Sequence, residues 1–301
     1  FESLRKEALV SPEKKDCYLI IDAMAIRKQT LWDSKSDRYV GFVDYGDIPA
    51  EKPDQYASEA LVFILVGARS SWKCPVGYFL TDKMNGKMQA KLVKEALIMA
   101  AAAGLHVYSV TADGTAVNFT MFSELGCKFT SSYETIVTKF KHPTQDYFVH
   151  AVLDPCHMLK LARNALAHLG SIVDCENNII KWKLFSSLNE IQECEGFHLA
   201  NKFSPRHLQF QKHKMNVQLA AQTLSASVAN ALDFLDKSMK LKEFQNSTGT
   251  VNFIRQVDRL FDILNSRSPI ANGFKQPLRP ESRNTWEEIL KQSAQYLLSL
   301  R

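Results

Sequence analysis

Two aspartates lie at the ends of apolar segments that have the composition of buried strands. Asp22 interrupts the apolar run of residues 18–27, and Asp113 directly follows the strand-like residues 105–112. A carboxylate in such a setting loses hydration at a high free-energy cost unless a metal ion, an opposite charge or hydrogen bonds compensate for it. Each aspartate is therefore either a metal ligand or a residue that caps a turn at a strand end. The choice depends on whether the fold brings the two side chains together.

The order of the surrounding segments predicts that the fold brings Asp22 and Asp113 together. Residues 18–27, 60–67 and 75–80 have strand composition, residues 31–39 predict strand, turn and strand, and residues 39–45 predict a further strand. A helix begins at Asn85-Gly86 and ends at Gly104, immediately before the strand that leads to Asp113. Residues 115–125 predict another helix.

This order fits a ribonuclease-H-like α/β fold, in which antiparallel strands precede a crossover helix and the next strand lies parallel to the first. Asp22 and Asp113 would then meet at one edge of an active site. Carboxylates suit Mg²⁺, and paired metal ions can activate a water or a 3′-hydroxyl for phosphodiester chemistry. The alternative is a non-catalytic α/β domain whose aspartates cap turns.

Other polar residues are weaker candidates. Asp82 also ends a strand, but it precedes the crossover helix. The histidines at positions 106, 150 and 198 are expected to pack or to lie at the surface. Asp154-Pro155 predicts the start of a helix that continues to residue 169. His157, Lys160 and Asn164 share one face of that helix, with Arg163 beside it. This face either points toward an active site or DNA phosphate, or is a solvated face behind a capping aspartate.

Composition limits the class of protein. The chain has 301 residues and a net charge of +5, which permits a nucleic-acid partner. Its six cysteines form no CxxC pair, so we expect a reducing compartment and no structural zinc. No apolar run reaches the roughly 18 residues needed to span a bilayer, so no membrane association is expected. The chain begins at Phe1, with neither an initiating Met nor a signal peptide, and we expect it to be a piece of a longer protein.

The character of the sequence changes after about residue 179. Apolar residues then recur at helical spacing, which predicts amphipathic helices over residues 182–191, 217–235, 253–264 and 286–298. We therefore predict an incomplete α/β ribonuclease-H-like domain over residues 1–176, followed by an all-α insertion domain over residues 177–301.

These segments resemble P-element-type DNA transposases, including vertebrate relatives that carry a THAP zinc finger. The resemblance covers nearly the whole chain and is carried by residues 21–28, 111–114, 154–164, 199–202, 212–217 and 261–266. It implies Mg²⁺-dependent DNA cleavage and strand transfer. Asp22 and Asp113 match the first two metal-binding acids of the catalytic triad in that family. The third, a glutamate, lies beyond the insertion and is assigned to no residue here.

The resemblance also implies that the helical domain binds GTP. Phe261 would stack on guanine, Asp262 and Asn265 would contact the nucleotide, and Lys212 or Lys214 would meet phosphates. The sequence contains no GxxxxGK[ST] phosphate loop, and residues 247–250 are more typical of a helix-capping turn. Without the resemblance, Phe261 could equally be a core aromatic, and the two lysines could form a solvated basic face.

The expected partners are double-stranded DNA, GTP and further copies of the same protein, and the expected location is the nucleus. Two alternatives stay open. One is a domesticated, catalytically silent relative that binds DNA or protein. The other is a nucleotide-binding module that acts in assembly.

Overall fold

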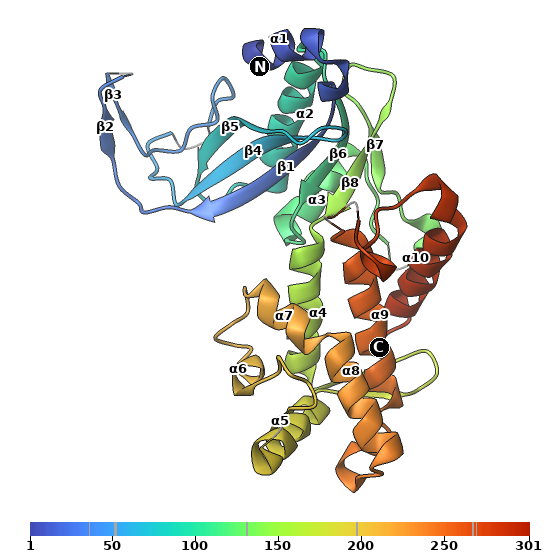
Figure 1. The fold of residues 1–301 in the computed structure, drawn as a ribbon. Coiled ribbons are helices and arrows are strands. Elements are labelled where there is room, and N and C mark those ends of the chain that lie inside the picture. Colours follow the sequence, from blue (N-terminus) through green and yellow to red (C-terminus); the bar gives the residue numbers. More distant parts are fainter. Residues whose placement is uncertain (36, 51–52, 131, 197, 267, 269) are drawn as a thin grey trace. The chain divides into compact units, whose positions relative to one another are not determined.

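The computed structural model describes residues 1–301 except 36, 51–52, 131, 197, 267 and 269. The chain divides into two compact units, Phe1–Asp154 and Pro155–Arg301. Each is described separately (Figure 1). None of the described helices is both long enough and apolar enough to cross a membrane.

A mixed sheet forms the centre of the first unit. Its strand order is β5-β4-β1-β6-β8-β7. β1 pairs antiparallel with β4, β4 pairs antiparallel with β5, and β1 pairs parallel with β6. This confirms the predicted arrangement of three antiparallel strands, a crossover helix and a parallel fourth strand. The strands are β1 (Asp16–Ala25), β4 (Glu59–Gly67), β5 (Lys73–Thr81), β6 (His106–Ala112), β7 (Lys139–Lys141) and β8 (Phe148–Leu153).

Helices cover one face of this sheet. They are α1 (Glu2–Val10), α2 (Gly86–Ala102) and α3 (Ala116–Leu125). Cys17, Leu19 and Ile21 of β1 are buried in the same core as α2 and α3, whereas the alternate residues Tyr18 and Ile20 are exposed. This alternation is the period of two expected of a strand. Asp22 therefore belongs to the face opposite that core.

The helix α2 begins as the sequence predicts. The Asn85 side chain accepts a hydrogen bond from the Met88 N–H at 2.8 Å, which satisfies one of the free donors of the first turn. Gly86 lies where α2 and α3 approach closely, because a Cβ atom there would be 2.6 Å from Cβ of Thr120. Gly104 has a φ of +80°, which is the left-handed conformation that ends many helices.

A separate hairpin, β2 (Leu31–Asp33) and β3 (Arg38–Val40), follows β1 and protrudes from the sheet (Figure 1). It confirms the predicted strand, turn and strand of residues 31–39. The further strand predicted over residues 39–45 is found only at residues 39 and 40, which belong to β3, and is wrong beyond them. The backbone turns at Gly41, which has a φ of +123°, and only single bridges join Phe42 to Tyr56 and Asp44 to Leu80.

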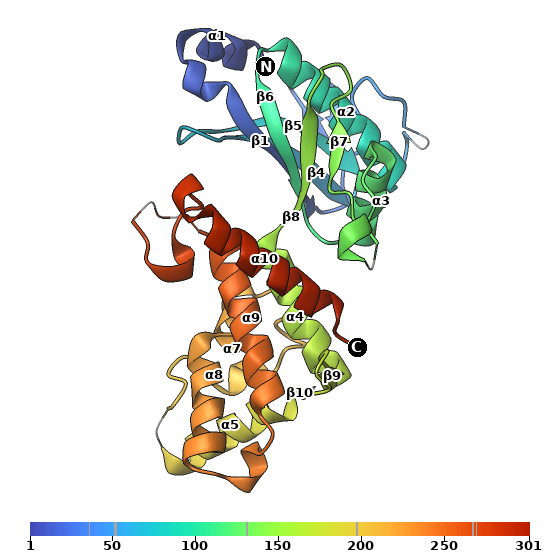
Figure 2. The ribbon, with the colours of Figure 1, turned by 90° about the vertical axis from the view of Figure 1, so that its right-hand side faces the viewer.

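The second unit is largely helical. Its core includes Leu166, Phe185, Val228 and Ile254, and α8, α9 and α10 pack in succession (Figure 2). The helices are α4 (Pro155–Leu169), α5 (Lys183–Glu195), α6 (Pro205–Leu208), α7 (Val217–Thr223), α8 (Ala226–Asp233), α9 (Thr248–Leu264) and α10 (Arg283–Leu298). A short π-helix, Phe234–Ser238, extends α8. Short 3₁₀ helices elsewhere in the chain cover Pro12–Lys14, Tyr133–Thr135, Lys242–Phe244, Gly273–Lys275 and Pro280–Ser282.

Two details of the predicted helical half need correction. The second unit contains an antiparallel strand pair, β9 (Ser171–Val173) and β10 (Ile179–Lys181), so it is not all-α. The buried Ile180 and a 2.9 Å hydrogen bond from the Lys181 N–H to Oγ1 of Thr250 fix this pair against α9. The helix predicted over residues 217–235 is broken at Ser225, whose extended backbone (φ −108°, ψ 154°) separates α7 from α8.

The two units meet at a different residue from the predicted domain boundary. The structure divides the chain between Asp154 and Pro155, whereas the sequence pattern places the division between residues 176 and 177. The reason is α4, which packs against α7 and α9 of the helical unit although it directly follows a strand of the sheet.

Candidate active site and nucleotide cavity

The parallel pairing of β1 with β6 places Asp22 opposite Asp113. Leu19 pairs with Val110, and Ile20 pairs with Thr111, so the same register continued by two residues aligns the two aspartates. A β-bulge precedes this stretch, because two residue steps on β1 match three on β6. Adjacent strands lie about 4.8 Å apart, so the register brings the two carboxylates into one neighbourhood.

Each aspartate is positioned by local hydrogen bonds. Asp22 is exposed, and its Oδ1 accepts from the Ala23 N–H at 2.9 Å. Asp113 is half-buried, and its Oδ1 accepts from the Thr115 N–H at 3.2 Å and from the side-chain amide of Asn118. Asn118 is itself fixed by the buried Gln89, whose Nε2 donates to Oδ1 of Asn118 at 2.7 Å. This chain of contacts sets the orientation of the Asp113 carboxylate and was not predicted from the sequence.

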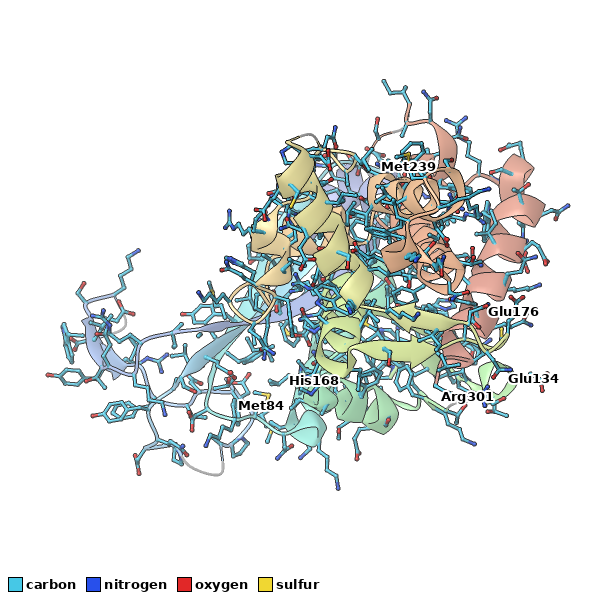
Figure 3. The ribbon with its side chains drawn as sticks, turned by 90° about the horizontal axis from the view of Figure 1, so that it is seen from below. Met84, Glu134, His168, Glu176, Met239 and Arg301 are labelled. Atoms are coloured by element: carbon cyan, nitrogen blue, oxygen red, sulfur yellow. The ribbon has the colours of Figure 1, made fainter. Side chains whose placement is uncertain are left out.

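Both aspartates line one cavity of about 450 Å³. Glu59 at the start of β4 also lines it, as does Met84, which Figure 3 labels at the turn between β5 and α2. Glu59 was missed because its place depends on pairing with Ala25 across the sheet. Within the described ranges, no group of three or more His, Cys, Asp or Glu residues is arranged to hold a metal ion. The two carboxylates supply the hard oxygen donors that Mg²⁺ prefers, but only part of a coordination shell.

Asp82 belongs to a different environment. It is almost completely buried, with 4% of its side chain exposed, and it forms an ion pair with Lys28 at 3.1 Å. The side chains of Gln55 and Ser58 also donate hydrogen bonds to it. The hydrogen bond from Ser58 and the contact with Lys28 hold the pKa of Asp82 below its ordinary value. These partners give Asp82 a structural role in joining the segments that precede α2.

The polar face of α4 is also largely structural. Arg163 is completely buried, and its Nη2 donates to the carbonyl oxygen of His213 at 2.9 Å while its Nε donates to Oδ1 of Asn164 at 2.7 Å. Nδ2 of Asn164 donates to the carbonyl oxygen of Lys214 at 3.2 Å. Arg163 therefore belongs neither to a DNA-facing surface nor to a solvated one, because it is buried and its hydrogen bonds hold the loop before α7 against α4.

A larger cavity of about 640 Å³ lies in the helical unit. Phe261, Asp262 and Asn265 all line it from the last turn of α9. Two lysines line it as well: Lys202, and Lys275, whose Nζ lies 3.6 Å from Oδ1 of Asp262. Lys275 follows α9 in a separate segment, so no local sequence pattern connects it with the other three. The volume falls in the range of about 300–1,000 Å³ that is typical of small-molecule sites.

The other residues proposed from the sequence lie elsewhere. Lys212 and Lys214 are exposed and are not among the described residues that line this cavity. The turn at residues 247–250 begins α9, and Ser247 occupies its N-cap position. The Ser247 side chain makes no capping hydrogen bond to α9, because its Oγ donates to Oδ2 of Asp236 at 2.8 Å, so the turn starts the helix without a side-chain cap.

A second acid in the cavity has an unusual environment. Asp258 precedes Asp262 by one helical turn and accepts a hydrogen bond from the Ala226 N–H at 3.2 Å. Burial, together with the nearby negative charge of Asp262, raises the pKa of Asp258 from 3.8 to about 6. A raised carboxyl pKa in a cavity is a common property of ligand-binding and catalytic sites.

Comparison with known proteins identifies both units. Residues 1–126 match the family described as the TNP-like RNase H N-terminal domain, and residues 156–277 match the TNP-like GTP-binding insertion domain. The chain is 32% identical over 291 residues to the DNA transposase THAP9 of Homo sapiens. The chain contains the two TNP-like domains and resembles P-element-type DNA transposases.

Two further comparisons agree with this assignment. The chain is 24% identical over 277 residues to the transposable element P transposase of Drosophila melanogaster. These alignments cover 94% and 87% of the chain but only 31% and 32% of the two relatives. The chain thus spans about a third of the length of these curated relatives. The fold matches a chain of the Drosophila P element transposase strand transfer complex with a TM-score of 0.74, 22% identity, and coverage of 93% of this chain and 58% of that chain.

Proposed function

We propose that this chain forms part of a DNA transposase that cleaves DNA and transfers the cut strand. Asp22 and Asp113 are two of its metal-binding carboxylates. The observation that carries this proposal is the parallel register that aligns the two aspartates in one cavity. The resemblance supports it, because the relatives are transposases by name.

The residues of this chain hold the acidic side chains in position for that chemistry. The Gln89–Asn118–Asp113 contacts orient one carboxylate, and the backbone N–H of Ala23 orients the other. Mg²⁺, when bound, would lower the pKa of a nucleophilic water and stabilise the charge on the leaving oxygen. The third acid of the family's triad, a glutamate, is assigned to no residue of this chain.

Site-directed variants of the whole transposase test this proposal. Asp22→Asn and Asp113→Asn should each abolish Mg²⁺- and Mn²⁺-dependent cleavage of a labelled transposon-end duplex while DNA binding persists. Glu95→Gln is the control and should leave cleavage unchanged, because Glu95 is an exposed acid of α2 that does not line this cavity. If the unchanged protein binds DNA but cleaves none with either metal, the chain belongs to a catalytically silent relative instead.

The helical unit is proposed to bind GTP in its 640 Å³ cavity. In this proposal Phe261 stacks on guanine, and Asp262 and Asn265 contact the nucleotide. Lys202 and Lys275 line the cavity and are better placed for phosphate contact than Lys212 or Lys214. Labelled GTP and ATP titrated against the 301-residue chain would test this. Phe261→Ala should reduce GTP affinity, and equal affinities for GTP and ATP would rule out guanine recognition.

The remaining parts of the proposal concern partners. DNA binding should depend strongly on salt, because lysine and arginine contacts with phosphates release counterions. A nuclear location and assembly into homo-oligomers are proposed on the basis of the transposase family. If GTP changes the oligomeric state of the whole protein and the protein cleaves no DNA with Mg²⁺ or Mn²⁺, the nucleotide-binding assembly module is the better description.

A further inference from the structure

A groove between the β2–β3 hairpin and β5 lies on the same side of the sheet as Asp22. Asp22 pairs with Val62 on β4, and Val62 pairs with Tyr78 on β5. Residues paired across adjacent strands point to the same face of a sheet. Tyr78 therefore shares the face of Asp22 at a separation of two strands, which corresponds to about 10 Å.

The lining of the groove combines exposed aromatic rings with positive charge. The groove has a volume of about 410 Å³ and is lined in part by Arg27, Arg38, Tyr39 and Tyr78. Tyr39 and Tyr78 are 65% and 69% exposed, which is unusual for two large side chains at one groove. Arg38 lies 3.9 Å from Asp44, but an exposed pair at this distance contributes little. Guanidinium groups and aromatic faces together are the features that bind single-stranded nucleic acid.

The groove is held in shape by its backbone. Asp44 and Leu80 exchange hydrogen bonds of 2.9 and 3.2 Å, which join its floor to β5. The Gly41 backbone packs so closely on Gln29 that a Cβ atom would lie 2.1 Å from the Gln29 carbonyl oxygen. Trp32 packs edge-on against Tyr39, with their ring centroids 5.0 Å apart. These contacts fix the hairpin that carries Tyr39, so the groove does not need a ligand to form.

We propose that this groove binds an unpaired nucleotide of the DNA strand next to the phosphate that is cleaved. Tyr39 and Tyr78 stack on the base, and Arg27 and Arg38 contact its flanking phosphates. The proposal rests on the proposed function, because the separation of about 10 Å from Asp22 matters only if DNA is cleaved there. A base-paired duplex keeps its bases stacked on one another and would leave both tyrosine faces in water.

The inference is tested by measuring how the metal-free 301-residue chain binds labelled DNA, so that no cleavage takes place during the measurement. The probes are a 20-base-pair duplex and the same duplex with a three-nucleotide single-stranded extension that carries 2-aminopurine. The wild-type chain should bind the extended probe more tightly, and its 2-aminopurine fluorescence should be quenched. Tyr39→Ala with Tyr78→Ala should weaken binding of the extended probe by roughly 5- to 150-fold per lost stack, with little effect on the plain duplex.

Several variants separate stacking from charge. Tyr39→Phe keeps the ring and should retain the preference for the extension. Arg27→Ala should weaken binding of both probes and reduce the slope of log K against log salt concentration by about one. Tyr18→Ala is the control, because Tyr18 is an exposed aromatic on the same face of β1 that does not line the groove. Thermal melting of each variant checks that the fold is kept.

The outcomes distinguish the inference from the function on which it rests. If the chain binds both probes equally and the tyrosine variants behave as wild type, the groove does not hold an unpaired nucleotide, while the transposase proposal stands. If the chain binds neither probe, the groove inference fails, whereas the transposase proposal is decided separately by the cleavage assay on the whole protein. If the double variant loses affinity for both probes alike, the tyrosines contact duplex DNA, and the inference is overturned in favour of a double-stranded ligand.

Discussion

Removing the charge of Asp258 should stabilise the helical unit at neutral pH. The pKa of this carboxyl is raised to about 6 in the folded protein, because burial and the neighbouring Asp262 disfavour the anion. The folded state therefore binds the proton more tightly than the unfolded chain. The resulting stability is fully present below the unfolded pKa of about 3.8 and is lost as the pH rises through about 6. Asp258→Asn keeps an oxygen that can accept the Ala226 N–H and removes the anion.

The size of the effect follows from the pKa shift. One pKa unit corresponds to about 1.4 kcal/mol, so a rise from 3.8 to about 6 gives at most about 3 kcal/mol above pH 7. A gain of that size would raise the midpoint of thermal unfolding by roughly 6–12 °C in a domain of this class. Hydrogen exchange of the α9 amides between pH 4.5 and 8, without nucleotide, would report the change for the helical unit alone.

A matched acid on α8 provides the control. Hydrogen bonding and charge from Lys237, with a further contribution from Arg255, hold the pKa of Asp233 below its ordinary value. Asp233→Asn should therefore destabilise the same unit at pH 7, and this loss should disappear as the pH falls below about 4. If Asp258→Asn is no more stable than wild type at pH 7.5, or if wild-type stability does not fall between pH 4.5 and 7, the argument from burial is refuted.

Three further predictions concern other buried contacts. His142 is 4% exposed and its pKa is lowered by burial, so the sheet unit should lose stability as the pH falls below about 6.5, and His142→Gln should flatten the profile measured by urea unfolding. Arg163→Lys cannot reproduce both hydrogen bonds of the guanidinium, including the 2.9 Å bond to the His213 carbonyl, and should cost about 1–3 kcal/mol in denaturant unfolding. Gly86→Ala places a Cβ atom 2.7 Å from a carbonyl oxygen of α3 and should destabilise the sheet unit by about 1–3 kcal/mol, whereas Gly77→Ala meets no atom within 4 Å and should leave the melting temperature nearly unchanged.

The fold of the sheet unit was predictable because its signals are local and their order is specific. Apolar runs mark β1, β4 and β6, and Asn85 and Gly104 mark the ends of the crossover helix. The failures arose where a single backbone conformation decides the outcome. Gly41 ends β3 after Val40, and Ser225 divides one amphipathic pattern into two helices. The apolar period continues through both positions and therefore gives no warning of the break.

The candidate sites were predictable only where a residue stands out in its own segment. Asp22 and Asp113 do so because each is an acid at the end of an apolar run. Glu59 and Gln89 enter the same cavity through pairing and packing between distant segments, which composition does not reveal. Lys275 reaches the nucleotide cavity from a segment beyond α9 for the same reason.

The β-bulge in β6 affects which small deletions related genes could tolerate. Between the paired positions, β6 has one more residue than β1, so deletion of one codon within the bulge would remove the extra residue and leave Asp113 level with Asp22. Deletion of one codon after the bulge, such as that of Ala112, would instead bring Asp113 level with Ile21, and the two aspartates would point to opposite faces of the sheet. A gene could therefore retain both acidic codons and still lose the alignment of the two carboxylates, so an inventory of related copies should compare the residue spacing after the bulge as well as the acids themselves.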